Sequence, residues 1–250
     1  MSNSASSGSA AAGHTDRFAA LADARRRTLL RLVHERSPDG DGIGKDDLAA
    51  EFAAVTADTR RHDVSADDQQ RALVELHHKL LPRLTDAGLL ETDDDVVRVP
   101  NEQLLDDTVF ADALSGSNRD LEATTLDALF EALADERRRR TLAILGDRYQ
   151  PVTTAALARA VAAAEADAVG HEVTQDRVDE VRTALVHVHL PLLHEATLIG
   201  YDDESGRVSY EGHPRVRTEW VRSTDGTPAI ETASTDADAA PDARRSPFPL

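Results

Sequence analysis

The chain has no cysteine and few aromatic residues, and both shortages limit what it can be. The lack of cysteine excludes a disulfide framework, a thiolate zinc site and a cysteine nucleophile. Hydrophobic residues make up 40% of the 250 positions and aromatic residues only 4%, so the core must be mostly aliphatic. No run approaches the roughly 18 apolar residues of a membrane span, and residues 1–15 lack the basic start and apolar run of a signal peptide. We therefore expect a cytoplasmic protein with no membrane partner.

Lysine is also scarce, and the charge is strongly one-sided. The sequence has 46 acidic against 28 basic residues, a net charge of -18, and its only lysines are Lys45 and Lys79. In molar salt the Debye length falls to ~3 Å, so repulsion within an acidic surface is screened. This composition is typical of a halophilic proteome, in which an acidic balance argues less strongly against nucleic-acid binding.

An internal repeat organises the chain. Residues 18–30 (FAALADARRRTLL) match residues 130–142 (FEALADERRRRTL), and residues 78–90 match residues 187–199 in the same order. Two ordered matches indicate two copies of one small domain. The predicted segments are a disordered tail at 1–15, a first domain at 16–100, a connector at 101–125, a second domain at 126–212 and a flexible C-terminal tail at 213–250.

Each copy is predicted to contain three helices followed by a β-hairpin. Apolar residues recur at helical spacing after Phe18 and Phe130, and Ser65 and Thr174 have the side chains of N-caps that open the third helices. Pro82 and Pro191 are predicted to end those helices, because an interior proline costs ~3 kcal/mol. The second helices are predicted at 46–55 and 154–164, and the hairpin strands at 89–91 with 96–99 and at 198–201 with 207–210.

This pattern resembles the winged helix, a variant of the helix-turn-helix. ALADERRRRTLAIL (132–145) is similar to the first helix of ArsR-type repressors, and LLPRLTDAGLLE (80–91) is similar to the end of their recognition helix. A closer resemblance is to a winged-helix domain of unknown function that is widespread in halophilic archaea, and it covers both copies. It implies a mainly α fold with small β-hairpin wings, arranged as tandem winged helix-turn-helix domains, and a role in transcription regulation.

The resemblance directs attention to the third helices, whose exposed residues read base edges in winged helices that bind DNA. Glutamine, arginine and threonine side chains suit base edges, and other basic residues suit phosphates. The DNA-binding candidates are Gln70, Arg71, His78 and Lys79 in the first copy and Arg177, Arg182, Thr183 and His187 in the second.

Acidic residues surround these candidates. The hairpin turns carry Asp93, Asp94 and Asp95 in one copy and residues 202–204 (DDE) in the other, where a DNA-binding wing would carry arginine or lysine. The first copy has 18 acidic and 13 basic residues (net -5), and the second has 16 and 9 (net -7). Neither copy shows the basic face expected of a nucleic-acid-binding domain.

The arginine runs 25–27 and 137–140 are the one basic concentration. Successive helix positions point ~100° apart, so each run spreads around its helix instead of forming one patch. We favour a structural interpretation, in which these arginines pair with Asp23, Asp135 and Glu136 and cover the edge of the core. Contact with phosphate is the alternative.

The histidines and the single tryptophan have plain interpretations. His187 and His189 diverge by ~200° on a helix, and adjacent histidines such as His77 and His78 diverge too. With no cysteine and no HExxH motif, we expect no metal site and assign His78 and His187 a capping or packing role if they do not contact DNA. Trp220 is expected to dock the start of the tail on the second copy, with partner binding as the alternative.

Catalysis has no support, because the sequence lacks GxSxG, P-loop and GxGxxG motifs. We expect no enzyme and no cofactor. The leading hypothesis is a DNA-binding transcriptional regulator of a halophilic archaeon, with two winged helices in one chain. The rival is a non-catalytic interaction or assembly module of the same fold, binding another protein or itself. A ligand sensor would need a pocket between the copies.

Overall fold

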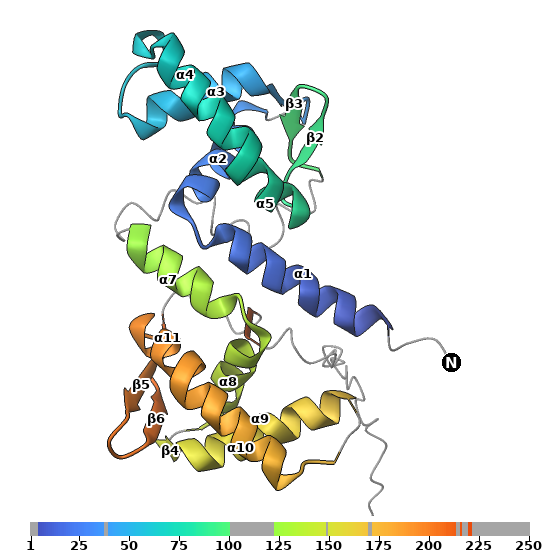
Figure 1. Ribbon diagram of the computed structural model, residues 1–250, viewed down its shortest axis with the longest axis vertical. Coiled ribbons are helices and arrows are strands. Elements are labelled where there is room, and N and C mark those ends of the chain that lie inside the picture. The colour runs from blue at the N-terminus through green and yellow to red at the C-terminus, as the bar shows by residue number, and fades with distance from the viewer. Residues whose placement is uncertain are drawn as a thin grey trace, which may run out of the picture.

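Figure 1 shows the computed structural model, in which two copies of a mainly helical unit lie on either side of a central pair of helices, α1 (Ala5–Leu21) and α7 (Ala123–Leu133). The structure describes residues 5–37, 40–100, 123–148, 150–169, 172–213, 216, 220 and 221. The predicted connector lies outside the described residues except at its last three positions, and so does most of the predicted C-terminal tail.

The first copy continues from α1 with helices and a three-stranded antiparallel sheet of order β1-β3-β2. Its helical elements are α2 (Ala24–Arg36), α3 (Lys45–Thr56), the short turn η1 (Arg61–Asp63), α4 (Ala66–Glu75), η2 (Leu76–Leu80) and α5 (Leu81–Asp86). Its strands are β1 (Ile43–Gly44), β2 (Glu91–Asp93) and β3 (Val96–Arg98).

The second copy repeats this order, and its sheet has the matching order β4-β6-β5. Its helical elements after α7 are α8 (Glu136–Gly146), α9 (Thr154–Val169), α10 (Gln175–Ala184), η5 (Leu185–His189) and α11 (Leu190–Glu195). Its strands are β4 (Val152–Thr153), β5 (Ile199–Asp202) and β6 (Arg207–Tyr210). The short strand β1 pairs with β3, and β4 pairs with β6, so each hairpin is extended to three strands. These two short strands were not predicted.

The first predicted helix of each copy is in fact two helices. Asp23 leaves the helical conformation (φ -148°) and its side chain accepts a hydrogen bond from the backbone N–H of Arg26, at 2.9 Å. Asp135 does the same (φ -125°), accepting from the backbone N–H of Arg138 at 3.0 Å. Each aspartate is the N-cap of a new helix, so the chain turns at both positions although the apolar spacing runs on.

The proline prediction is wrong about where the third helix ends. Residues 66–86 and 175–195 are helical throughout, and each is called a long helix below. The five residues before Leu81 form a π-turn, in which the N–H of Leu81 donates to the carbonyl oxygen of Leu76. Proline has no N–H, and its ring crowds the carbonyl four residues before it. The wider π-turn makes room for Pro82, and η5 does the same for Pro191.

The tail predicted to be disordered at residues 1–15 is also corrected, because α1 begins at Ala5. This segment is rich in alanine, the strongest helix former, and its C-terminal part continues into Phe18, which is fully buried. Trp220 is buried, but its ring lies 5.9 Å from that of Phe18, edge to face, and not only against the second copy as expected. Its aromatic partner thus comes from the helix that opens the first copy.

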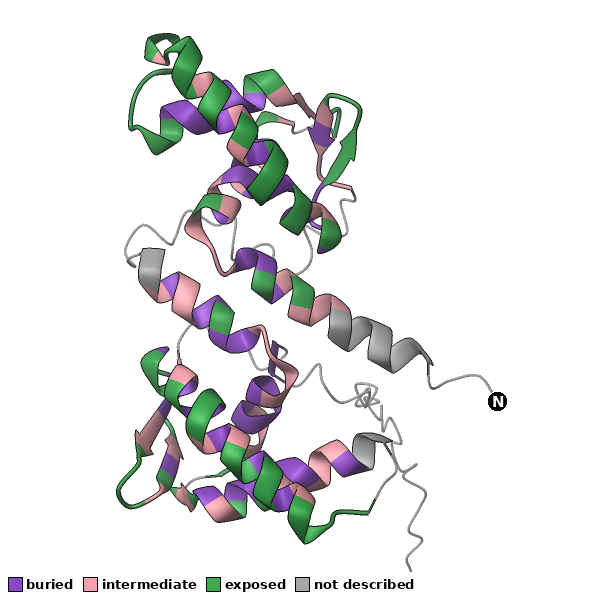
Figure 2. Cartoon of the chain, viewed as in Figure 1, coloured by how far each residue is buried: buried purple, intermediate pink, exposed green. Residues whose placement is uncertain are grey.

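The two copies share one continuous core. Figure 2 shows buried residues on the facing sides of α1 and α7. Phe18 and Phe130 meet there, with ring centroids 6.4 Å apart, and Leu21 and Leu133 are fully buried beside them. Within each copy the core extends to the sheet, where Val97 and Val208 hold equivalent positions.

Equivalent residues of the two copies exchange equivalent contacts across this interface. The Arg27 guanidinium lies over the Phe130 ring at 5.6 Å, and the Arg139 guanidinium lies over the Phe18 ring at 5.6 Å. Both pairs of equivalent residues, 27 with 139 and 18 with 130, are 112 positions apart. The copies are therefore related by an approximate two-fold axis, as in an isologous dimer.

Hydrogen bonds follow the same symmetry. Nη1 of Arg27 donates to the carbonyl oxygen of Leu21, and Nη1 of Arg139 donates to that of Leu133, both at 2.7 Å. A second bond crosses between the copies in each direction. Arg27 Nη1 donates to Asp127 Oδ1 at 2.6 Å, and Arg139 Nη2 donates to the hydroxyl of Thr15, the position equivalent to Asp127, at 3.0 Å.

Candidate functional site

The long helices present exposed faces on the same side of the molecule. In Figure 1, α4 lies in front of α3 and α10 lies in front of α9. Figure 2 shows exposed residues along the front of both long helices. The N-caps of these helices are those predicted, since Ser65 Oγ accepts from the backbone N–H of Asp68 and Thr174 Oγ1 from that of Arg177.

All four candidates of the first copy are exposed: Gln70, Arg71, His78 and Lys79. Gln70 and His78 line a groove of about 560 Å³ between the long helix, the start of α3 and the hairpin turn. The groove also includes Lys45, at the start of α3, whose ammonium donates to the backbone carbonyl of Asp94. Lys45 was not among the candidates, because only the fold brings α3 beside the long helix.

Three of the four candidates of the second copy are exposed: Arg182, Thr183 and His187. They line one shallow depression of about 390 Å³ on the long helix. The hydroxyl of Thr183 donates to the carbonyl oxygen of Asp179 at 2.9 Å. His78 and His187 are both exposed, so neither has a packing role in the core.

Arg177, the fourth DNA-binding candidate of the second copy, is held by two carboxylates. Its guanidinium donates to Glu165 and to Glu180, each at 2.8 Å, and it is partly buried. The hydrogen bond to Glu180 is the main cause that raises the pKa of Arg177 above its ordinary value. These ion pairs give Arg177 a structural role in the second copy, and its contact with DNA stays a prediction.

The arginine runs also have structural roles, as we favoured. Arg26 and Arg138 donate through Nε to the carbonyl oxygens of Ala20 and Ala132, at 2.6 and 2.7 Å, and so satisfy the carbonyls near the ends of α1 and α7. Burial lowers the pKa of Arg138 and Arg139. Of the remaining residues, Arg25 pairs with Glu75, Arg137 with Glu165 and Arg140 with Glu136.

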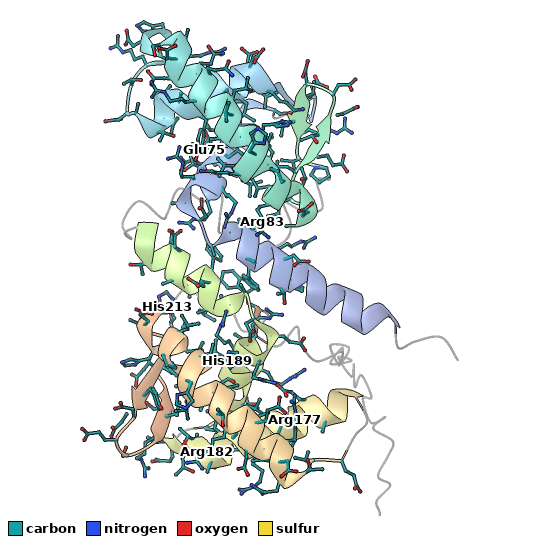
Figure 3. All side chains as sticks on the ribbon, viewed as in Figure 1. Glu75, Arg83, Arg177, Arg182, His189 and His213 are labelled. Carbon is teal, nitrogen blue, oxygen red and sulfur yellow. The ribbon has the colours of Figure 1, made fainter. Side chains whose placement is uncertain are left out.

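Some cationic side chains of the long helices form no ion pair within the described part of the chain. Lys79, Arg83 and Arg182 make no ion pair with any described residue, whereas Arg71 is paired with Asp68 at 2.9 Å. Figure 3 labels Arg83 and Arg182 on the long helices of the first and second copy. Arg83 was not among the candidates, because the predicted helix ended before it. Lys79 and Arg83 lie in the C-terminal part of the first long helix, and Arg182 lies near the middle of the second.

The hairpin turns remain acidic in the folded protein. All three aspartates at 93–95 are exposed, and so are Asp202, Asp203 and Glu204. Asp202 accepts hydrogen bonds from the side chain and backbone of Ser205 and from the backbone N–H of Glu204, and these lower its pKa. Asp202 therefore stays negatively charged at neutral pH.

Glu165 is the centre of a partly buried charge network in the second copy. It accepts two hydrogen bonds from Arg137, at 2.5 and 3.0 Å, and one from Arg177. Burial alone would raise the pKa of Glu165, but these hydrogen bonds and positive charges outweigh it, so the pKa lies below its ordinary value. Sequence reasoning missed Glu165, because it lies on α9, outside both arginine runs and both long helices.

This network predicts a pH-dependent effect of Glu165→Gln. The substitution should destabilise the protein by about 1 to 3 kcal/mol near neutral pH, because it removes charge-assisted hydrogen bonds from two arginines. A carboxylate with a lowered folded-state pKa stabilises fully above its unfolded-state pKa, and the effect disappears as pH falls through the folded-state value. Urea unfolding from pH 7 down to acid should therefore show the two proteins converging.

Glu180→Gln is the matched control for this experiment. Glu180 also pairs with Arg177, but its side chain is 66% exposed, so its loss should change stability by no more than about 0.5 kcal/mol. A Glu165→Gln effect that stayed constant down to acid pH would contradict the assigned charge network.

Metal and membrane motifs are not found in the described part of the chain. Among the described residues no group of three or more histidine, aspartate or glutamate side chains is placed to hold a metal ion. No helix in the described ranges combines the length and apolar character that crossing a bilayer requires.

Comparison with known proteins identifies the family. The model of the family described as Domain of unknown function (DUF7344) matches residues 18–99 and again residues 130–209. Because these matches cover more than half of the chain, the chain belongs to this family. The two matched regions confirm the two tandem copies inferred from the repeat. No curated protein and no solved structure matches the chain.

Proposed function

We propose that the protein is a DNA-binding transcriptional regulator, with two winged-helix domains held in one chain as a pseudo-dimer. Three observations support a winged helix in each copy. Two helices precede the long helix, the long helix has an exposed face, and the β-hairpin that follows it pairs with the short strand β1 or β4. In this proposal the long helix of each copy enters the major groove and the hairpin is the wing.

The observation that carries the proposal is the approximate two-fold relation of the copies. Residues 27 and 139 exchange equivalent contacts with residues 130 and 18, and both long helices face one side of the molecule. Duplex DNA has the same local symmetry, and dimers with this arrangement read two half-sites about one helical turn apart. Because the two long helices differ in sequence, the half-sites would differ as well.

The exposed side chains suggest how the contacts are divided. Gln70, which has a donor and an acceptor, and Arg182, which has donors only, suit base edges, and Arg71 and Thr183 lie beside them. Lys79 and Arg83 have no ion pair to a described residue and so suit phosphates. The acidic composition supports a working environment of molar salt, in which phosphate attraction is weak and base and shape contacts carry more of the affinity.

The test is selection of DNA by the purified full-length chain from a random library, in molar KCl. We expect an enriched site with two unlike halves about one helical turn apart. Arg182→Gln should weaken binding to that site by about tenfold and relax one half of it, because one base contact is lost. Arg159→Gln removes the same charge from an exposed position on α9 and should leave affinity within about twofold.

Selection that enriches no sequence, or an Arg182→Gln effect no larger than that of Arg159→Gln, would overturn the proposal. If the enriched site had only one half and the bound chain were monomeric, the proposal that the two copies bind two half-sites would be overturned.

A second candidate function is a non-catalytic protein-interaction or assembly module. The acidic hairpin turns favour it, because both are exposed and charged at the position where a DNA-binding wing would be basic. This function predicts no enriched DNA, together with recovery of one defined partner from cells by the intact chain. Neutralising residues 202–204 to NNQ should then abolish the recovery, and should leave DNA selection unchanged or improved if the first proposal holds.

A further inference from the structure

The groove of the first copy combines apolar and acidic side chains. Its apolar side chains come from the long helix: Leu73, Val74, Leu76 and Leu81. Val74 is 49% exposed, and Leu73 is half-buried beside it. An exposed apolar surface inside a groove is typical of a site that binds a partner segment.

The charges of the groove are mostly negative. Three carboxylates line it, and Lys45 is its one ammonium, which donates to the backbone carbonyl of Asp94. Asp47 is paired with Arg61, whereas Asp46 and Asp95 make no ion pair with any described residue. Apolar surface beside unpaired carboxylates suits a segment that is both apolar and basic.

The second copy lacks this combination on the same fold. The copies align at a separation of 109 residues from α3 to the hairpin, and the backbone N–H groups of Lys45 and Thr154 donate to the equivalent carbonyl oxygens of Asp95 and Gly206. The second copy has Ala155 for Asp46, Arg182 for Leu73, Thr183 for Val74 and Gly206 for Asp95. The fold therefore does not require an apolar, acidic groove, and the arginine of the second copy would repel a basic segment.

Residues 244–250 (RRSPFPL) have the chemistry that the groove calls for. Residues 223–243 before them contain five acidic residues and no lysine or arginine. Arg244 and Arg245 then bring two positive charges, and Phe248 is the only aromatic residue after Trp220. Ser246 and Phe248 each precede a proline, which favours the extended backbone that many groove-binding peptides adopt.

The chain between the core and this segment is long enough to reach the groove. Trp220 and Val221 are buried, so the chain is anchored at this point. Residues 222–243 can span up to ~70 Å at ~3.3 Å per residue, whereas a domain of ~100 residues has a radius of gyration of only ~13 Å. A tethered segment is present at an effective concentration in the millimolar range, so a weak contact is enough for docking.

We propose that residues 244–250 bind in the groove of the first copy within the same chain, with Phe248 against Val74 and the two arginines beside the unpaired carboxylates. The aromatic ring buries the exposed apolar surface, and arginine forms charge-assisted hydrogen bonds with carboxylates. Gln70 and His78 line the same groove, so the docked segment covers two of the DNA-binding candidates. The docking itself is independent of whether the protein binds DNA.

The test places a nitroxide spin label at Ala243→Cys in the full-length chain, in molar KCl. The chain has no cysteine of its own, so the label goes to this position alone. Methyl NMR follows Val74 and, as the matched reference, Val188, which is 50% exposed on the second long helix. We expect the label to abolish the Val74 signals by paramagnetic broadening and to leave the Val188 signals in place.

Variants on both sides of the contact make this result specific. Phe248→Ala should lower the ratio of docked to free segment about tenfold and restore the Val74 signals, because the ring is the main apolar contact. Ile230→Ala removes an apolar side chain outside the segment and should change that ratio by less than about twofold.

On the groove side, Asp46→Ala combined with Val74→Thr introduces the residues of the second copy. This double variant should lower the ratio about tenfold, with the Leu73 methyl groups as the readout. Because the second copy folds with alanine and threonine at these positions, the variant keeps the fold.

Three outcomes would overturn the proposal. The first is that the label broadens Val74 no more than Val188, which would leave the groove to another partner. The second is that broadening persists unchanged in Phe248→Ala. The third comes from mixing spin-labelled chain of natural isotopic abundance with isotopically labelled chain that has no spin label. Broadening of Val74 in that mixture would mean that the segment of a second molecule fills the groove. None of these measurements contains DNA, so the DNA selection succeeds or fails separately.

Discussion

Replacing Phe18 with alanine is expected to lower the free energy of unfolding by about 3 to 5 kcal/mol, the usual cost of removing a buried aromatic ring. Phe18 is fully buried and lies against Phe130 and Trp220, at the point where α1 meets α7. The substitution should lower the stability of both copies, because the ring belongs to the core that they share. Urea unfolding followed by circular dichroism measures it, with Trp220 fluorescence as a local reporter.

Two comparisons make this result specific. Phe130→Ala should cost a similar amount, since Phe130 holds the equivalent position in the second copy and is 2% exposed. Val188→Ala changes a side chain that is 50% exposed and should stay within about 0.5 kcal/mol. If Phe18→Ala destabilised the protein no more than Val188→Ala, the two copies would not share a core.

Arg139→Ala is expected to destabilise the protein by about 2 to 4 kcal/mol, although arginine is usually a surface residue. Arg139 is 1% exposed, donates to the carbonyl of Leu133 and to the hydroxyl of Thr15, and covers the ring of Phe18. Truncation removes this donor from the carbonyl of Leu133 and opens a void beside the ring. Thermal and urea unfolding at neutral pH measure the loss.

Symmetry supplies the matched variants for this second prediction. Arg27→Ala removes the equivalent contacts and should also destabilise, whereas Arg83→Ala removes an exposed arginine and should change stability by less than about 0.5 kcal/mol. A double-mutant cycle between Arg139→Ala and Phe18→Ala should show a coupling of about 0.5 to 2 kcal/mol from the cation–π contact. Strict additivity would mean that the ring and the guanidinium do not interact.

The symmetric interface also determines how the two long helices are arranged. Fusing two copies fixes the spacing and orientation of the long helices at any protein concentration, whereas a dimer depends on concentration. It also lets the copies diverge, as where the second copy has His189 and the first has Leu80.

The sequence alone predicted those features that depend on local chemistry. The repeat defined two copies, and the family matches at 18–99 and 130–209 confirm them. The N-caps Ser65 and Thr174 are as predicted, since a capping hydroxyl acts within a few residues. Both predicted hairpins form, but the first strand of the first hairpin is 91–93 and not 89–91, so two residues of the predicted turn lie in the strand. The structural role of the arginine runs was also predicted, because successive helix positions point ~100° apart and a run cannot form one basic patch.

Other features were decided only by tertiary packing. The π-turns before Pro82 and Pro191 exist because both halves of each long helix are anchored to the core. Nothing in the sequence pointed to an ion-pair partner for Arg177. In the structure Arg177 donates to Glu165, which lies 12 positions earlier on another helix. Contacts between distant segments carry no local signature, so only the fold could bring these residues together.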